Sequence, residues 1–209
     1  MPRLTFIDKV HEEGDVYTFK VVKPQNLRHR AGKHGLFVIP GWYRPHPFTL
    51  SSAPEENFVS FSTHVKTGSR FKRRIMKFKQ GDTLFLFGPV MNFTLDRSRK
   101  SHIFLAQGIG VTPFRSMLVH AHHAGVDDHI TLVHVDNETP VFKDVTSSYA
   151  TESYYPTSAE AFRDIVAKLD KDALFYLSGS PKFVRTTRQF LHTNGVKRRN
   201  IKIDLFLGY

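Results

Sequence analysis

The feature that most constrains this 209-residue chain is a change in its pattern near residue 96. Before that point, short β-prone runs are separated by Gly, Pro and Asn, at residues 4–7, 16–22, 36–39, 58–65 and 83–87. This spacing is typical of an antiparallel barrel or sandwich. One helical stretch interrupts the runs at about residues 70–78, where apolar side chains share one helical face.

After the polar, basic segment 96–101, strand-like and helix-like runs alternate. Strands are expected at residues 102–106, 130–135, 174–177 and 201–206, and helices at 113–123, 158–169 and 181–191. Such alternation favours a parallel sheet covered on both faces. We therefore predict two domains, an antiparallel β-barrel over residues 1–96 and an α/β domain with a parallel sheet over residues 97–209.

Composition excludes several functions and leaves others open. The chain has no cysteine, which excludes disulfides, thiolate metal sites and cysteine-ligated iron–sulfur clusters. No apolar run approaches the ~20 residues that span a bilayer, so we expect a cytoplasmic protein without membrane insertion. The formal net charge of +11 attracts a polyanion, which can be a nucleic acid, an anionic lipid or an acidic protein.

A glycine-containing turn follows the first predicted strand of the second domain. Gly108 and Gly110 come after that strand, and Thr112 and Pro113 begin the next helix. Glycines let the backbone turn tightly and approach a pyrophosphate, and the N–H groups at a helix N-terminus attract that anion. Pro113 suits a first helical position. An ordinary turn between strand and helix is the alternative.

The clearest motif lies in the first half, at His46-Pro47-Phe48-Thr49. Here the chain resembles the ferredoxin–NADP reductase superfamily, whose barrel carries an R-x-[YF]-[ST] flavin motif, in the H-P-F-T variant of ferric-reductase and NADPH-oxidase relatives. The resemblance implies bound FAD, or FMN as the fallback. It places His46 as the cation on the flavin pyrophosphate, Phe48 as the ring stacked on the flavin, and Thr49 as the hydrogen-bond partner of flavin N5.

Neighbouring residues extend this expected flavin site. Two residues before His46, Arg44 would point to the same face of a continuous strand and share the phosphate. An edge strand interrupted by prolines is the alternative interpretation. The flavin contacts implied around the motif come from Arg44, Pro47 and Ser51.

The resemblance covers nearly the whole chain. The family's second flavin-phosphate segment matches His64, Val65, Lys66, Gly68, Ser69, Arg70 and Phe71. Residues 88–93 are similar to the family's G-P-x-G-x-F, with Asn92 in the place of the second glycine. Residues 176–181 resemble the C-G-P segment near the nicotinamide, with Ser178 in place of the cysteine and Gly179 next to it. The final Tyr209 matches an aromatic that covers the flavin face where nicotinamide docks.

An acidic residue, Asp136, follows the second strand of the predicted parallel sheet. A carboxylate there accepts hydrogen bonds from a ribose 2′-OH and repels a 2′-phosphate. We expect NADH to be preferred over NADPH. A loop aspartate that makes its own turn is the alternative.

Together, these patterns predict a flavoprotein reductase that transfers hydride between NADH or NADPH and FAD, with Thr49, Ser178 and Tyr209 at the reacting atoms. The acceptor would be an acidic electron-transfer protein such as a ferredoxin or flavodoxin. The basic runs 70–74 and 197–199 are predicted to be solvated faces, or landing surfaces for that partner.

The sequence allows three other interpretations. A flavin-binding sensor or scaffold without dehydrogenase activity would explain the departures at Gln107, Ser178 and Ser180. A basic barrel that binds single-stranded nucleic acid leaves the second half of the chain unexplained, so we expect no nucleic-acid partner. We also expect no metal site, because histidines near a helix end, at residues 120–123, suit the helix dipole and solvent.

Overall fold

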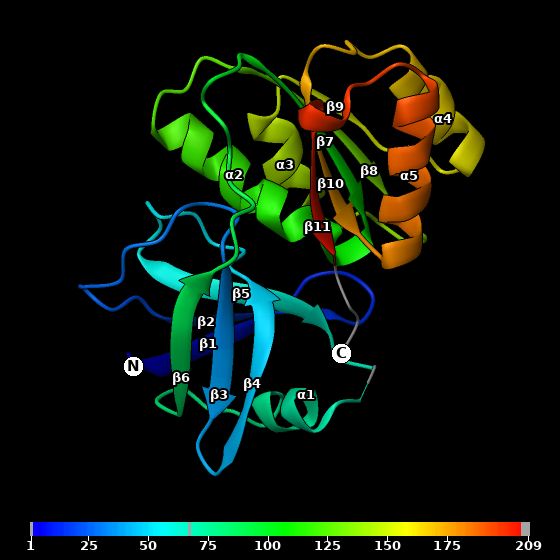
Figure 1. Ribbon diagram of the computed structural model, residues 1–209. Coiled ribbons are helices and arrows are strands. Elements are labelled where there is room, and N and C mark those ends of the chain that lie inside the picture. Colours follow the sequence, from blue (N-terminus) through cyan, green and yellow to red (C-terminus); the bar gives the residue numbers. More distant parts are fainter. Residues whose placement is uncertain (1, 67, 206–209) are drawn as a thin grey trace.

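The computed structural model describes residues 2–66 and 68–205, with Trp42 and Tyr43 described in their backbone only. Two sheets dominate it, one above the other in Figure 1. None of the helices in these ranges is long and apolar enough to cross a bilayer.

The first sheet is antiparallel and has the order β4-β3-β6-β1-β2-β5. Its strands are β1 Arg3–His11, β2 Val16–Val22, β3 His34–Ile39, β4 Trp42–Thr49, β5 Phe58–His64 and β6 Thr83–Val90. The short helix α1, Arg70–Ile75, lies between β5 and β6 in the chain. The prolines of β4 are tolerated because β4 is an edge strand, where a missing N–H breaks no second ladder.

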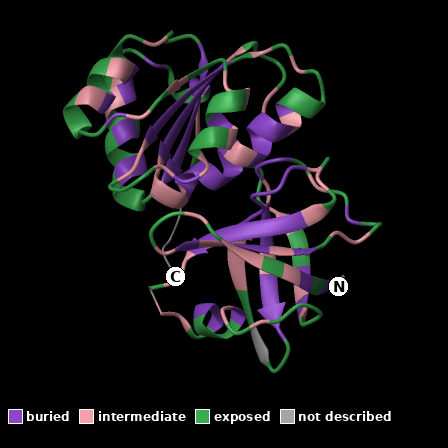
Figure 2. Ribbon diagram, turned by 180° about the vertical axis from the view of Figure 1, so that it is seen from behind, coloured by how far each residue is buried: buried purple, intermediate pink, exposed green. Residues whose placement is uncertain are grey.

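The second sheet is parallel, in the order β11-β10-β7-β8-β9. Its strands are β7 Ser101–Gln107, β8 His129–Val135, β9 Glu152–Tyr154, β10 Leu174–Gly179 and β11 Ile201–Leu205. The helices are η1 Gly108–Val111, α2 Thr112–His123, α3 Lys143–Tyr149, α4 Ala159–Ala167, α5 Pro181–Thr193 and η2 Arg198–Asn200. Helices α2 and α3 lie on one side of the sheet and α4 and α5 on the other, so its central strands are buried (Figures 1 and 2).

The two domains share an apolar core and a polar seam. In the core, Ala31 and Phe93 from the first half pack with Phe114 and Met117 of α2. The seam joins α2 to the loop of residues 51–56, and Arg115 is its main contributor. The guanidinium of Arg115 donates to both carboxylate oxygens of Glu56, at 2.5 and 2.8 Å, and to the carbonyl of Ser51 at 2.9 Å. These contacts fix the barrel against the parallel sheet.

The predicted fold class is confirmed, since an antiparallel barrel-like sheet precedes a parallel sheet covered by helices. The expected boundary at residue 96 falls in the segment 91–100 between β6 and β7. Helix α3, strand β9 and the 3-10 turn η2 were not expected, and β4 was expected only through its motif. Helix α1 ends at Ile75 rather than at residue 78, and a 3-10 turn precedes α2.

Candidate functional site

Strand β4 presents the flavin motif on alternate residues. Arg44 is exposed, while His46 and Phe48, two and four residues later, are half-buried. The ring of Phe48 stacks on Phe61 of β5, with centroids 4.7 Å apart, and lies 5.4 Å from the ring of Phe71. The segment is an edge strand with prolines, as the alternative interpretation has it, and His46 and Phe48 lie on alternate residues of its regular part. Its pairing with β3 is irregular between Trp42 and His46, so Arg44 does not belong to the continuous strand that was expected.

Helix α1 brings the second flavin segment to β4. The Phe71 ring lies 4.5 Å from that of His46. Ser69 caps the helix by accepting from the Lys72 backbone N–H, and Gly68 has a φ of 67°, which glycine adopts without strain. Arg70 is exposed at the start of the helix. These residues lie together beside the flavin motif.

Other residues predicted for the flavin site have structural partners. Asp15 binds His64 Nδ1 at 2.6 Å and the backbone N–H of Lys66 at 2.9 Å. Val65 packs against the barrel core. The Ser51 hydroxyl lies in a buried serine group, 2.9 Å from the Oγ of Ser60 and 3.1 Å from that of Ser62, and Pro47 pairs with Leu36 of β3.

The charge beside the motif differs from the prediction. Burial, helped by the charge of Lys72, lowers the pKa of His46, so its ring is neutral near pH 7. Its Nε2 atom is buried without a hydrogen-bond partner among the described residues. Lys72 is only 5 % exposed, so the prediction of a solvated basic face over residues 70–74 is wrong at this position. A neutral His46 next to a buried lysine replaces the expected histidine cation.

Thr49 belongs to a buried polar group that joins the domains. Its Oγ1 lies 3.1 Å from His34 Nε2, and the same nitrogen lies 3.4 Å from Oδ1 of Asp204 on β11. Ser178 of β10 is in register with Asp204, so both side chains point to one face of the sheet. All four side chains are buried. Of the three residues predicted at the reacting atoms, Thr49 thus contacts this group directly, and Ser178 lies on the strand next to Asp204.

Sequence reasoning missed His34 and Asp204. An acidic residue within the apolar strand 201–206 was a usable signal, because aspartate is rarely buried without a partner. His34 gave no signal, because its position next to Asp204 depends on how the two domains pack. Burial raises the pKa of Asp204 to about 7 and lowers the pKa of His34 to about 4.

The glycine turn leads from β7 through η1 into α2. Gly108 has a φ of 51° and open space where a Cβ would lie, while Gly110 packs directly on the backbone of Ser178 and Gly179. The N-terminus of α2 has no side-chain cap and no acidic residue in its first turn, and Pro113 lies in that turn. The Thr112 hydroxyl donates to a carbonyl of the turn. The first turn of α2 is buried and continues directly from η1, so Gly108 is the open part of this turn.

A cavity of about 770 Å³ opens at the carboxyl ends of β7, β8 and β10. Gln107, Asp136 and Lys182 are among its lining residues. The Asp136 carboxylate accepts from the backbone N–H of the next residue at 2.8 Å, so the alternative in which it makes its own turn is observed. The Ser180 hydroxyl donates to the side-chain oxygen of Gln107 at 2.6 Å, which links the end of β10 to the end of β7. Open parallel sheets bind ligands at this edge.

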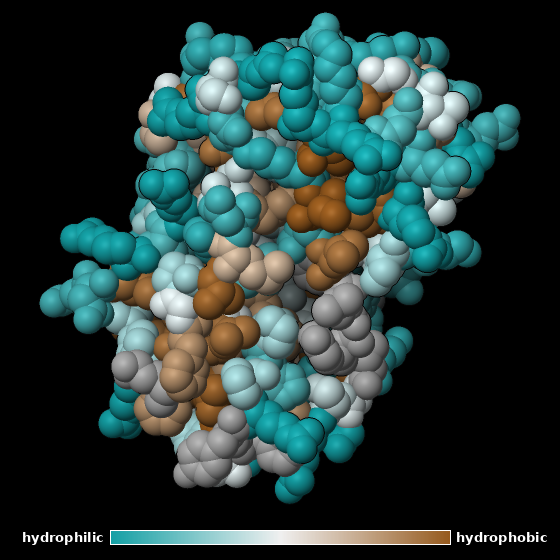
Figure 3. Space-filling model, viewed as in Figure 1, coloured by the Kyte–Doolittle hydropathy of each residue, from teal (hydrophilic) through white to brown (hydrophobic). Residues whose placement is uncertain are grey.

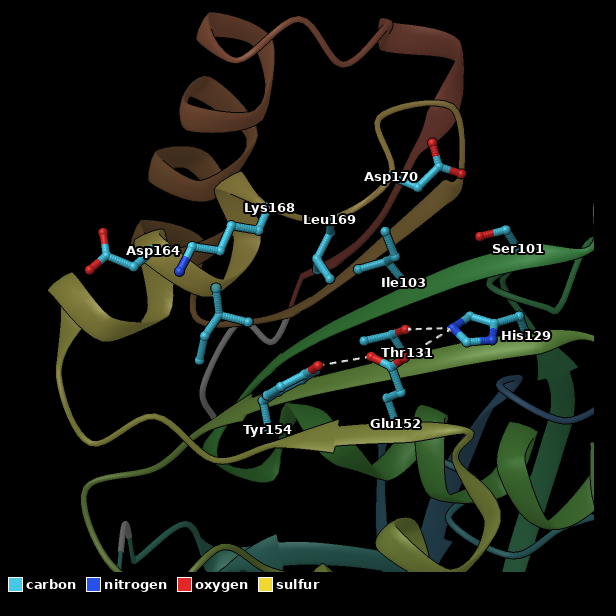
Figure 4. Close-up of a pocket in the computed structure, with 11 residues that line it drawn as sticks. Ser101, Ile103, His129, Thr131, Glu152, Tyr154, Asp164, Lys168, Leu169 and Asp170 are labelled. Carbon is cyan, nitrogen blue, oxygen red and sulfur yellow. Dashed lines mark hydrogen bonds and ion pairs between the residues drawn. The ribbon is translucent and has the colours of Figure 1, made fainter.

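A second cavity, of about 450 Å³, lies at the amino ends of β7 and β8 (Figure 4). Its polar side chains bond one another: Tyr154 donates to Glu152 at 2.8 Å, and His129 lies 3.7 Å from the same carboxylate. Ligands of open parallel sheets bind at the carboxyl ends of the strands, whereas this cavity lies at their amino ends, so the candidate site is the larger cavity.

The surface near the domain junction is partly apolar. Figure 3 shows hydrophobic side chains on the face that carries β6 and β11. Phe87 of β6 and Ile203 and Leu205 of β11 are all more than 40 % exposed. Tyr209, the third residue predicted at the reacting atoms, lies outside the described residues.

Known proteins resemble this chain in sequence and in fold. No family model matches the chain. A 208-residue alignment with the toluate 1,2-dioxygenase electron transfer component of Pseudomonas putida is 24 % identical and covers 88 % of this chain. The chain spans 62 % of that relative's length.

Two solved structures match over 98 % of both chains. One is the flavohem-like FAD/NAD-binding domain of nitric oxide dioxygenase from Vibrio cholerae, with a TM-score of 0.78 and 21 % identity. The other is a ferredoxin NADP+ reductase from Neisseria gonorrhoeae with bound FAD and NADP, with a TM-score of 0.77 and 17 % identity. At these identities the likeness establishes the fold.

Proposed function

We propose that this chain, whose two domains have the fold of the ferredoxin–NADP reductase superfamily, is a flavin-dependent oxidoreductase that transfers hydride between NAD(P)H and FAD. The observation that carries the proposal is the link from Thr49 on the barrel, through His34, to Asp204 at the carboxyl end of β11, where Ser178 of β10 is the register neighbour of Asp204. A flavin on β4 and a nicotinamide at β10 would meet at this group. Hydride transfer between two cofactors depends chiefly on such alignment.

The residues beside β4 fit a flavin. Phe48 offers a half-buried aromatic ring, and the buried Nε2 of His46 has no described partner, so a bound phosphate or ring would satisfy it. Lys72 supplies positive charge next to His46, and Arg70 adds an exposed cation at the start of α1. When bound, FAD supplies an acceptor for hydride at N5 and releases electrons to the next carrier.

The parallel sheet supplies the dinucleotide site. The open side of Gly108 would face the pyrophosphate, while the cavity of about 770 Å³ would hold the adenosine end. Ser178 and Gly179 at the end of β10 would lie by the nicotinamide. Tyr209 remains a proposed cover for the flavin face.

We expect the protein to bind FAD, and Phe48→Ala to weaken that binding. Loss of stacking and of buried ring area should cost about 1–3 kcal/mol, which corresponds to a Kd about 5- to 150-fold higher. Titration of the flavin-free protein with FAD, followed by flavin fluorescence, measures the effect. Titration with FMN identifies the preferred flavin.

Phe78→Ala is the matched control, because Phe78 is another half-buried ring of the same domain that packs edge-on against Phe6. It should lose stability without a change in the Kd for FAD. A wild-type protein that binds neither FAD nor FMN would refute the proposed function.

We propose that NADH is the better reductant, and that Asp136 contributes to this preference. Asp136→Asn keeps an oxygen that can accept the turn hydrogen bond but removes the negative charge at the cavity. The kcat/KM for NADPH should therefore rise, by about 3- to 10-fold, while that for NADH changes less. A wild-type preference for NADPH of about tenfold or more would contradict this assignment.

We propose an acidic electron-transfer protein, such as a ferredoxin or flavodoxin, as the acceptor, and the cytoplasm as the location. The net charge of +11 supports the choice of an acidic partner. A flavin-binding sensor without dehydrogenase activity is the second candidate, favoured by serine at position 178 in place of the family's cysteine. Reduction of the bound flavin by NADH separates the two candidates.

A further inference from the structure

A buried histidine of the parallel sheet contacts the glycine turn. His134 lies on β8, next to the end of that strand, and its side chain is fully buried on the face that also carries Leu132. Its Nε2 atom lies 3.0 Å from the carbonyl oxygen of Gly108. The carboxylate of Asp136 is 3.8 Å from the same nitrogen, which is too far for a hydrogen bond. The histidine is therefore bonded to the turn and not to the nearby aspartate.

The chemistry of these atoms determines the state of the ring. A carbonyl oxygen can only accept, so Nε2 must carry the proton. Nδ1 is then a bare acceptor, and it has no hydrogen-bond partner among the described residues. Burial lowers the pKa of His134 and outweighs the charge of Asp136 and the bond to Gly108, which raise it. His134 is therefore neutral near pH 7 and donates to the turn.

The turn is held by both strands that flank β7. On one side, Gly110 packs on the backbone of Ser178 near the end of β10. On the other side, the Gly108 carbonyl accepts from His134 of β8. Gly108 has a φ of 51°, with open space where a Cβ would lie. Glycine adopts this φ without strain but adopts many others as readily, so the bond to His134 helps to select this conformation.

The same hydrogen bond orients the next N–H group. The peptide between Gly108 and Ile109 is trans, so its carbonyl and its N–H point in opposite directions. Because the carbonyl points to the buried ring, the Ile109 N–H points away from it. Gly108 and Ile109 are only half-buried, so this side of the turn is accessible. Backbone N–H groups where a strand turns into a helix are well suited to bind a pyrophosphate.

We propose that His134 is a positioning residue for the dinucleotide, and that it keeps the Ile109 N–H turned toward the pyrophosphate by holding the Gly108 carbonyl. This inference rests on the proposed function, because the dinucleotide is the ligand that the turn would face. It assigns a role to a residue that belongs neither to the glycine turn nor to the flavin motif.

The role is tested by rapid anaerobic mixing of the FAD-loaded protein with NADH, which gives the Kd for NADH and the limiting rate of flavin reduction. His134→Leu keeps apolar volume but removes the donor, so the Kd should rise about 5- to 20-fold. His134→Gln keeps an N–H near the place of Nε2, so its Kd should stay within about threefold of the wild type. The limiting rate should change by less than about twofold in both variants, because the loss is in binding.

His102→Leu is the matched control. His102 is also a fully buried histidine of this sheet, but it lies near the amino end of β7, beside Asp128. Its replacement should leave the Kd for NADH unchanged. The hydrogen bond itself is tested by NMR of the ring nitrogens in the whole wild-type chain, where His134 should carry its single proton on Nε2 near pH 7.

A Kd for NADH that is unchanged in His134→Leu, or that rises equally in His134→Gln, would overturn the positioning role. An equal rise in His102→Leu would also overturn it, because the effect would then be general destabilisation. A ring that carries its proton on Nδ1 would overturn the hydrogen bond to the turn. A wild-type flavin that neither NADH nor NADPH reduces would overturn the proposed function and this role with it, while the NMR result would still decide the hydrogen bond.

Discussion

Arg115→Ala should destabilise the protein by about 3–4 kcal/mol near pH 7, because it leaves the Glu56 carboxylate half-buried without its partner. The guanidinium makes two bonds to that carboxylate and one to the carbonyl of Ser51, and both charged side chains are less than one-fifth exposed. Urea unfolding at pH 7 measures the loss. Arg188→Ala, an exposed arginine on α5, should change stability by less than about 0.5 kcal/mol.

The pH dependence identifies the cause. In the wild type, burial raises the pKa of Glu56, but the hydrogen bonds and charge of Arg115 outweigh it and hold the pKa below the usual 4.5. The pair therefore stabilises the fold above that value and is lost as the pH falls through the lowered pKa. In Arg115→Ala burial still raises the pKa of Glu56 and is opposed only by the Ala53 backbone N–H and the charge of Lys20, so the carboxyl becomes protonated at a higher pH than in the wild type. The destabilisation should shrink at about pH 4, and an equal loss at both pH values would contradict this explanation.

Gly110→Ala is expected to have a comparable effect through sterics alone. The added Cβ would lie 2.4 Å from the carbonyl oxygen of Ser178 and 2.8 Å from the backbone nitrogen of Gly179. Backbone atoms cannot rotate away, so β10 and η1 must separate, at a cost of about 3 kcal/mol. The melting temperature should fall by about 6–12 °C. Because Ser178 moves with this separation, dinucleotide binding should weaken as well.

Gly108→Ala separates the steric effect from a general cost of replacing a turn glycine. The φ of Gly108 is 51°, but nothing lies within 4 Å of the added Cβ. Only the left-handed backbone penalty of about 1–2 kcal/mol applies. A melting temperature lowered equally in Gly108→Ala and Gly110→Ala would show that the approach of η1 to β10 is not the constraint.

The fold could be predicted from the sequence where local patterns decide it. The β-prone runs and the alternation after residue 96 correspond to β1, β2, β3, β5 and β6 and to the parallel sheet. Strand β4 gives no β-prone run, because its prolines disfavour strands, and its motif is what predicted a strand there; its edge position permits the prolines. Strand β9 has three residues, which is too short for a periodic signal.

The site was less predictable, because it depends on contacts between domains. The resemblance identified Thr49 and Ser178, and both are buried. Thr49 is linked through His34 to Asp204, which is the register neighbour of Ser178. His34 and Asp204 lie 170 residues apart in the chain, so no local pattern links them. The neutral state of His46 was not predictable for a different reason, which lies within the first domain. Burial and the charge of Lys72 lower the pKa of His46, and Lys72 belongs to a basic run that the sequence predicts to be exposed.

The most direct test of the proposed function is an anaerobic titration of the FAD-loaded protein with NADH, followed by the visible absorbance of the flavin. If β4 and the carboxyl edge of the parallel sheet align the two cofactors, about one equivalent of NADH should bleach the flavin. NADPH should do so less efficiently. A flavin that stays oxidised in the presence of excess NADH and excess NADPH would contradict the assignment as a reductase.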